Sequence, residues 1–122
     1  MDECNVPGFG DFMTVECSGR GAVAVVKVAG RMDAESAPRF DQACQTAMDG
    51  GAAHIVVDVA DLQYVSSMGL RSFLSFAKAL QKAGGTMPLC GMRGLVKEVF
   101  DLTHLTPLFP MFDSTEAAIE SI

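Results

Sequence analysis

The sequence has no long apolar run and no concentration of basic residues. A membrane-spanning helix needs about 20 consecutive apolar residues, so no such helix is predicted. The first three residues, Met-Asp-Glu, are acidic where a secretory signal would be basic, and we therefore expect no signal peptide. The net charge of -6 at pH 7 disfavours binding to nucleic acid and to anionic membrane surfaces.

Closely spaced cysteines are also missing. The four cysteines are far apart and include no C-x-x-C pair, which favours reduced thiols in a cytoplasmic protein over disulfides or a metal cluster. Cys44 and Cys90 have apolar neighbours, and we predict that both are small core residues.

Motifs typical of enzymes are absent as well. The sequence has neither the G-x-x-x-x-G-K-[ST] loop that holds nucleotide phosphates nor the G-x-S-x-G element of many serine hydrolases. His54 and His104 are far apart and have no metal-ligand spacing. We therefore expect a non-enzymatic protein with no catalytic residue, no metal and no cofactor.

The hydrophobic pattern of the 122 residues indicates one α/β domain. We expect residues 1–11 to be loosely ordered and residues 12–122 to form the domain. The elements begin with two strands and a helix and then alternate, which predicts a mixed sheet of four or five strands with about four helices mainly on one face. The predicted strands cover 12–17, 22–28, 54–59, 86–90 and 107–112, and the predicted helices cover 37–48, 68–82, 94–102 and the residues after Ser114.

The most informative segment is the end of the third predicted strand. An apolar strand leads into a turn, and two hydroxyl residues, Ser66 and Ser67, stand where the next helix begins. A helix start exposes backbone N–H groups and a partial positive charge, which suit a phosphate. No catalytic partner lies nearby in the sequence. The pair therefore indicates a modified switch residue rather than a nucleophile, although two serines here can also be an ordinary N-cap pair.

Two motifs show which family this chain resembles. The run GRMD at 30–33 and the run DLQYVSSMGL at 61–70, in this order of elements, resemble a STAS domain of the bacterial anti-sigma factor antagonist type. The resemblance extends from residue 12 to the C-terminus. It implies a small mixed sheet with helices mostly on one face. It also implies binding to an anti-sigma factor serine kinase, release when that kinase phosphorylates a serine, and reversal by a serine phosphatase.

The resemblance places the phosphorylated serine at Ser67, with Ser66 as the alternative. Many members of the family have an aspartate where this chain has Ser66. It also places a partner-binding surface around the start of the second helix and the preceding loop. The expected contact residues are Asp33, Ser66, Met68, Gly69, Leu70 and Arg71.

Three residues of these two motifs allow more specific expectations. The missing side chain of Gly69 would let a partner's backbone come close. Asp33 is as well explained by a helix-entry turn as by a partner contact. Asp61 is expected to serve in a turn at the end of its strand, with a partner contact as the alternative.

The expected function is thus that of a partner-switching regulator, monomeric alone and active in heterocomplexes. The alternative is a STAS scaffold subunit of a secretion regulator, a stressosome-like particle or a lipid-transport complex, without a phosphorylation switch. A hydrolase that uses Ser67 as its nucleophile is a third hypothesis, but no base for it is evident in the sequence.

Overall fold

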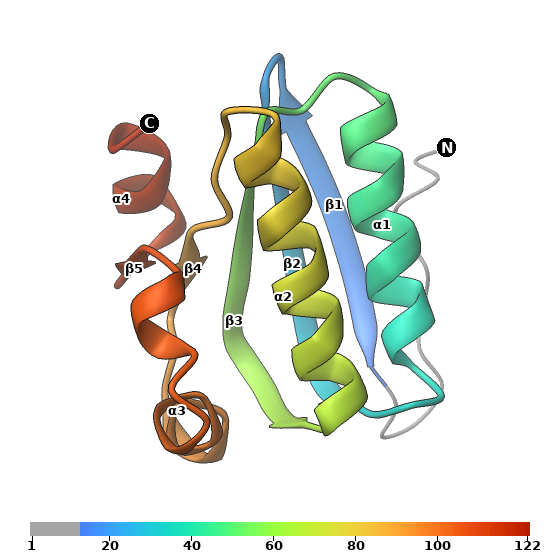
Figure 1. Cartoon of the computed structure of the whole chain (residues 1–122), viewed down its shortest axis with the longest axis vertical. Helices are drawn as coiled ribbons and strands as arrows, with labels where there is room; N and C mark the ends of the chain where they lie inside the picture. Colours follow the sequence, from blue (N-terminus) through green and yellow to red (C-terminus); the bar gives the residue numbers. More distant parts are fainter. Residues whose placement is uncertain (1–12) are drawn as a thin grey trace.

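Five strands form one mixed sheet in the order β1-β2-β3-β4-β5 (Figure 1). The computed structural model describes residues 13–122. β1 pairs with β2 in antiparallel fashion, and all the later pairs are parallel. The carboxyl ends of β2, β3 and β4 therefore point to one edge of the sheet, which we call the carboxyl edge. The strands are β1 (Thr14–Arg20), β2 (Val23–Met32), β3 (His54–Val65), β4 (Leu89–Cys90) and β5 (Met111–Phe112).

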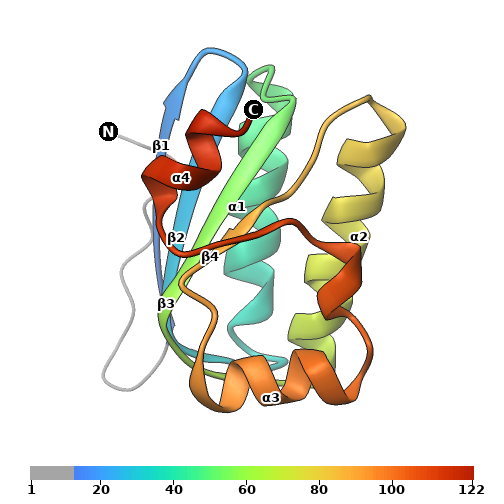
Figure 2. The same cartoon turned by 90° about the vertical axis from the view of Figure 1, so that its left-hand side faces the viewer.

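Four α-helices pack on this sheet, mainly on one face as predicted. α1 (Ala37–Asp49) and α2 (Ser67–Lys82) lie side by side on that face, and α3 (Gly94–Leu102) runs across the carboxyl edge (Figures 1 and 2). α4 (Thr115–Glu120) packs on the opposite face (Figure 2). Among the described helices, none has the length and apolar character needed to cross a membrane.

The main core lies between the sheet and the first three helices. Alternate residues of β2 and β3 point into it, as the twofold periodicity of a strand requires. Phe73 of α2 is at its centre, and its ring contacts the rings of Phe40, Phe100 and Phe109 at centroid distances of 4.8, 5.5 and 6.5 Å. Cys44 belongs to this core, and Cys90 belongs to a smaller cluster under α4, so both predicted core cysteines are confirmed.

The largest error in the predicted elements concerns the end of β3. We expected the strand to stop at Val59, but it continues to Val65, where it still pairs with Met32 of β2. A shift in register between the two strands near Asp61 breaks the simple alternation that the prediction relied on. Asp61 therefore lies inside a strand rather than in a turn, and its carboxylate is 3.5 Å from the Lys27 ammonium.

The predicted fourth and fifth strands are also too long. Only Leu89–Cys90 and Met111–Phe112 are strands, and a 3-10 helix at Thr106–Leu108 precedes the latter. Prolines at 88, 107 and 110 remove backbone N–H groups that longer ladders would use. The loosely ordered segment predicted for residues 1–11, and the strand start at residue 12, lie outside the described residues.

Candidate functional site at the carboxyl edge

The parallel pairing of β2 and β3 brings two strand-to-helix junctions together. Met32 ends β2 and pairs with Val65, the last residue of β3. The backbone N–H of Ser66 donates to the Met32 carbonyl at 2.8 Å, so the two chains remain bonded as they leave the sheet. Asp33 and the serine pair, which are far apart in the sequence, therefore lie at the same edge.

Ser66 is the N-cap residue of α2. Its backbone is extended (φ -86°, ψ 174°), and its hydroxyl oxygen accepts a hydrogen bond from the Gly69 N–H at 3.3 Å. Its carbonyl also accepts the Leu70 N–H at 2.9 Å, which closes the first helical turn. The Ser66 hydroxyl is therefore occupied in stabilising the helix.

Ser67 is the first residue of α2, and its side chain is exposed. Within residues 13–122 its hydroxyl has no hydrogen-bond partner. The N–H groups and positive end of the helix dipole lie beside it, and α2 has no acidic residue in its first turn. A negatively charged group on Ser67 would therefore be well placed.

Gly69 is buried beneath the serine pair. A Cβ at this position would lie 2.7 Å from Val65 Cγ2 and 2.9 Å from Met32 Sδ. The space left by the missing side chain is filled by the domain's own residues, so it is not available to a partner. Close packing of the helix start on the strand ends explains the glycine.

The other predicted contact residues of α2 differ in exposure. The side chain of Met68 is 44% exposed, and Arg71 is exposed. Leu70 is partly buried and packs against the main core. Met68 and Arg71 therefore provide side-chain surface beside Ser67, whereas Leu70 mainly anchors the helix.

Asp33 organises the turn between β2 and α1. Its carboxylate accepts the backbone N–H groups of Glu35 and Ser36 at 3.1 and 3.0 Å. The Ser36 hydroxyl in turn accepts the Asp33 N–H at 2.9 Å and lies 2.8 Å from the Arg31 carbonyl, to which it donates. The hydrogen bond from the Ser36 N–H is the main cause that lowers the pKa of the Asp33 carboxyl below its ordinary value. The structure thus accounts for Asp33 as a turn residue.

Sequence reasoning missed the third segment at this edge, the loop that leads from β4 into α3. The Arg93 Nε donates to the Ala60 carbonyl at 3.0 Å, and Leu95 at the start of α3 is 52% exposed. Together with residues 60–63 of β3, Arg93, Gly94 and Leu95 line a shallow hollow. The signal that could have found this segment is topological, because parallel neighbouring strands end at the same edge.

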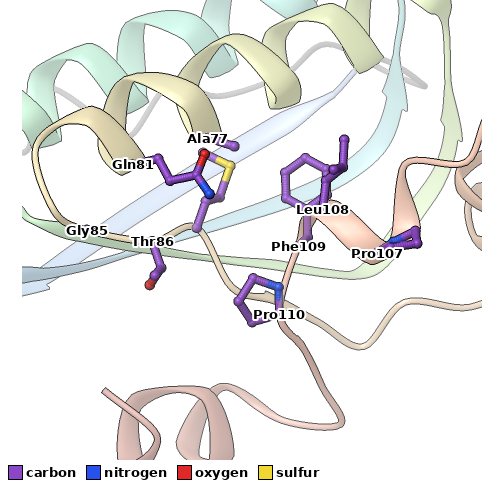
Figure 3. Close-up of a pocket in the computed structure, with 9 residues that line it drawn as sticks. Ala77, Gln81, Gly85, Thr86, Pro107, Leu108, Phe109 and Pro110 are labelled. Carbon is purple, nitrogen blue, oxygen red and sulfur yellow. The ribbon is translucent and has the colours of Figure 1, made fainter.

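A second hollow lies between the C-terminal half of α2 and the segment before β5 (Figure 3). Ala77 and Gln81 of α2 line one side, and Phe109 and Pro110 line the other. No charged residue lines this hollow, which makes it a poor site for acid–base chemistry.

The structure also places one of the two histidines away from the serine pair. His54 begins β3, and its Nδ1 lies 2.9 Å from the Thr86 hydroxyl oxygen. A strand rises about 3.3 Å per residue, so the 12 residues of β3 separate His54 from Ser67 by roughly 35 Å. His54 therefore cannot be the base that a Ser67 nucleophile would need.

Comparison with known proteins identifies the family. The model of the STAS domain matches residues 14–118. BtrV of Bordetella bronchiseptica, named as a candidate anti-sigma factor antagonist, is 34% identical over 89 residues, which are 73% of this chain and 77% of BtrV. The anti-sigma F factor antagonist of Paenibacillus polymyxa is 25% identical over 114 residues, or 90% of this chain and 95% of that protein. The crystal structure of an anti-sigma factor antagonist from Mycobacterium paratuberculosis has a TM-score of 0.82 at 22% identity, and the match covers 95% of this chain and 98% of that one.

Proposed function

Because the chain belongs to the STAS domain family, we propose that it is an anti-sigma factor antagonist that changes partners when Ser67 is phosphorylated. In this proposal the unphosphorylated chain binds an anti-sigma factor serine kinase and thereby frees a sigma factor or a similar regulator. The phosphorylated chain lets the kinase go. The names of the relatives support the first half of the proposal, and the geometry of the serine pair supports the second.

The proposal rests on a difference in hydrogen bonding between the hydroxyls of Ser66 and Ser67. The Ser66 hydroxyl is used by the Gly69 N–H, whereas the Ser67 hydroxyl is exposed and has no partner within the described residues. A kinase that phosphorylates the Ser67 hydroxyl therefore breaks no hydrogen bond formed within residues 13–122. Phosphorylation of Ser66 would instead require the helix cap to rearrange, at a cost of about 1 kcal/mol.

The effect of a phosphate on Ser67 differs between the domain and its partner. Phosphorylation adds a charge of about -1.5 to -2 at pH 7 and three acceptor oxygens. The N-terminal N–H groups and dipole of α2 favour that charge, so we expect the fold to survive. A protein surface packed on Ser67 would meet a bulky, hydrated dianion, and each loss of about 1.4 kcal/mol weakens binding tenfold.

The partner surface in this proposal centres on Ser67. Met68 and Arg71 provide exposed side chains on α2, and the Asp33 turn and the start of α3 extend the surface along the carboxyl edge. Uncatalysed hydrolysis of a phosphate monoester is extremely slow, so a serine phosphatase must complete the cycle.

The acceptor is tested by incubating the chain with ATP and each histidine-kinase-like serine kinase of the source genome. Intact-mass and peptide analysis should show a single phosphoryl group on the wild-type chain and on Ser66→Ala. Ser67→Ala should remain unmodified. Phosphorylation of Ser67→Ala to the wild-type extent would assign the switch to another residue.

The switch itself is tested by binding of the same kinase to Ser67→Asp and Ser67→Ala. We expect Ser67→Asp to bind at least about tenfold more weakly than wild type, and Ser67→Ala to bind as wild type does. Ser18→Asp is the matched control, because Ser18 is exposed on β1, outside the proposed surface. Equal affinities of Ser67→Asp and Ser67→Ala would contradict the switch and favour a STAS scaffold without one.

A further inference from the structure

The charge of α2 is opposite to that of the whole chain. The chain carries a net charge of -6, yet the sequence of α2, SMGLRSFLSFAKALQK, contains three basic residues and no acidic residue. The three basic residues are Arg71, Lys78 and Lys82. If these basic side chains were scattered over the helix or paired with acidic residues of the chain, they would indicate no binding partner. Their positions on the helix and their ion pairs therefore have to be compared.

The basic residues of α2 form one continuous line with Ser67. Successive residues of an α-helix are rotated by about 100°, so Ser67, Arg71, Ser75, Lys78 and Lys82 fall within an arc of about 80°. We call these five residues the α2 stripe. All five are exposed, and at 1.5 Å per residue the stripe is about 22 Å long. Figure 1 shows α2 in front of the sheet, with no other element over its outer side.

The charges of the stripe are not used within the described domain. The three ion pairs formed by residues 13–122 involve Lys27, Arg93 and Lys97 as the basic partners. Arg71, Lys78 and Lys82 take part in none of them. A line of exposed, unpaired charges of one sign is an electrostatic surface available to another molecule.

We propose that the α2 stripe docks an acidic surface of the protein partner, and that Arg71 is the point at which phosphorylation weakens this contact. The inference rests on the proposed function and adds the chemistry of the partner to it. Charge complementarity carries it, because the net charge of -6 repels an acidic partner from the chain as a whole, whereas three basic residues without an ion pair in the described residues attract it to α2. The stripe would therefore set the orientation in which the partner approaches Ser67.

Arg71 couples the stripe to Ser67 through helix geometry. Residues four apart on a helix are neighbours, with Cβ atoms about 5–6 Å apart. The guanidinium of Arg71 can therefore reach a phosphate on Ser67 and bond it through two N–H groups. The phosphate would take Arg71 away from the partner's carboxylates and would also place negative charge at the start of the stripe.

Other anionic partners fit the stripe less well. Recognition of an anionic membrane typically uses clusters of four to eight basic residues. Stable contact with a nucleic acid typically neutralises about six to ten phosphates. Three basic residues in a chain of net charge -6 fall short of both, whereas a few acidic side chains on a protein match them.

The docking surface is tested with the serine kinase that binds the wild-type chain, by comparing Lys78→Glu with Lys27→Glu. The two substitutions change the charge equally, but Lys27 lies between Val26 and Val28 of the main core and so points to the opposite face of the sheet. We expect Lys78→Glu to weaken binding about tenfold at low salt, with a smaller effect at high salt, and Lys27→Glu to stay within about twofold. Equal effects of the two substitutions would overturn the inference.

The outcome separates the inference from the proposed function. Release by Ser67→Asp together with no effect of Lys78→Glu would leave the switch in place and overturn the stripe. Loss of binding in Lys78→Glu without any effect of Ser67→Asp would support the stripe and contradict the phosphorylation switch. Binding of the wild-type chain to phosphatidylserine vesicles or to a DNA duplex, lost in Lys78→Glu, would also overturn an acidic protein as the occupant.

The role of Arg71 is tested without any partner. Phosphoserine can be incorporated at position 67 during translation, and the pKa of its phosphate followed by phosphorus NMR. The positive charge of Arg71 should hold that pKa below the ordinary value of about 6, and Arg71→Gln should raise it. Lys82→Gln is the control, because it lies about 22 Å away along the helix, beyond the screening length of about 8 Å. A phosphate pKa unchanged by Arg71→Gln would overturn the coupling.

Discussion

The β2–α1 and β3–α2 junctions at the carboxyl edge both contain a serine, yet they use it in opposite ways. At the β2–α1 junction, Ser36 is 2% exposed, and its hydroxyl bonds the backbone of Asp33 and Arg31. At the β3–α2 junction, Ser66 takes the capping role, and the Ser67 hydroxyl is left exposed. A serine at a helix start is therefore not a switch by itself. What distinguishes Ser67 is that no residue in the described part of the chain bonds its hydroxyl.

The comparison also shows why a second serine is useful at the β3–α2 junction. With Ser66 holding the cap, changes at Ser67 act on the surface and leave the helix start intact. The β2–α1 junction has no such division of roles, because its one hydroxyl is buried and holds the turn. The following predictions test this difference.

The largest effect is expected when the two hydroxyls are removed in turn. Ser36→Ala should lower the free energy of unfolding by about 2 kcal/mol, because it leaves the Asp33 N–H and the Arg31 carbonyl without their partner. Ser67→Ala should change it by less than about 0.5 kcal/mol. Urea denaturation measures both. Similar losses for the two variants would mean that the Ser67 hydroxyl is used by the fold after all.

A somewhat smaller effect is expected from the packing beneath the serine pair. In Gly69→Ala the new methyl group would collide with Val65 and Met32, at a cost of about 1–3 kcal/mol that the better helix propensity of alanine offsets by about 1 kcal/mol. The difference is a net loss of up to about 2 kcal/mol, which urea denaturation measures. Gly50→Ala is the matched control, because its nearest atoms would be 3.4 and 3.5 Å away, in ordinary contact. Equal stability of the two variants would show that the α2 start is not closely packed.

The third effect concerns the cap itself. Ser66→Ala should cost about 1 kcal/mol in the free energy of unfolding, because the Gly69 N–H loses its acceptor. Ser66→Asp should retain most of the stability, since a carboxylate caps equally well and suits the positive end of the helix. If Ser66→Ala were as stable as wild type, the Ser66 hydroxyl would be as available as that of Ser67. Hydrogen bonding would then no longer favour Ser67 over Ser66 as the site of phosphorylation.

Much of the fold was predictable from local signals. α3 was predicted with its observed bounds, and the predicted α1 and α2 each differ from the observed helix by one residue. These helices have a clear 3.6-residue apolar pattern and glycine or serine at their ends. The strands were harder, because a register shift near Asp61 hides the end of β3 and two-residue strands have no periodicity to detect.

The helix start at Ser66 and Ser67 was predictable in position, but the hydrogen bonding of the two hydroxyls was not. The pair Ser66 and Ser67 stands out in the sequence as a helix start, yet the two residues are chemically identical. In the structure, the hydrogen bond that the Ser66 hydroxyl accepts from the Gly69 N–H and the greater exposure of Ser67 distinguish them. The reason for Gly69 was likewise out of reach, because Met32 is distant in the sequence and meets Gly69 only through the pairing of β2 with β3.

The smallest effect should appear in the pH dependence of the β2–α1 junction. Hydrogen bonds from the N–H of Ser36, and then those from its hydroxyl and from the N–H of Glu35, lower the pKa of the Asp33 carboxyl in the folded chain. A lowered folded pKa means that the carboxylate stabilises the fold above the pKa of the unfolded chain, about 3.9, and that this contribution is lost as the pH falls through the folded pKa.

Asp33→Asn keeps a side-chain oxygen for these N–H groups but removes the charge. The difference in unfolding free energy between wild type and Asp33→Asn should therefore be constant near neutral pH and shrink as the pH falls below about 4. Urea denaturation at a series of pH values measures this difference. A difference that did not change with pH would show that the turn depends on the shape of the Asp33 side chain and not on its charge. The β2–α1 junction would then resemble the Ser66 cap, where a neutral oxygen is sufficient.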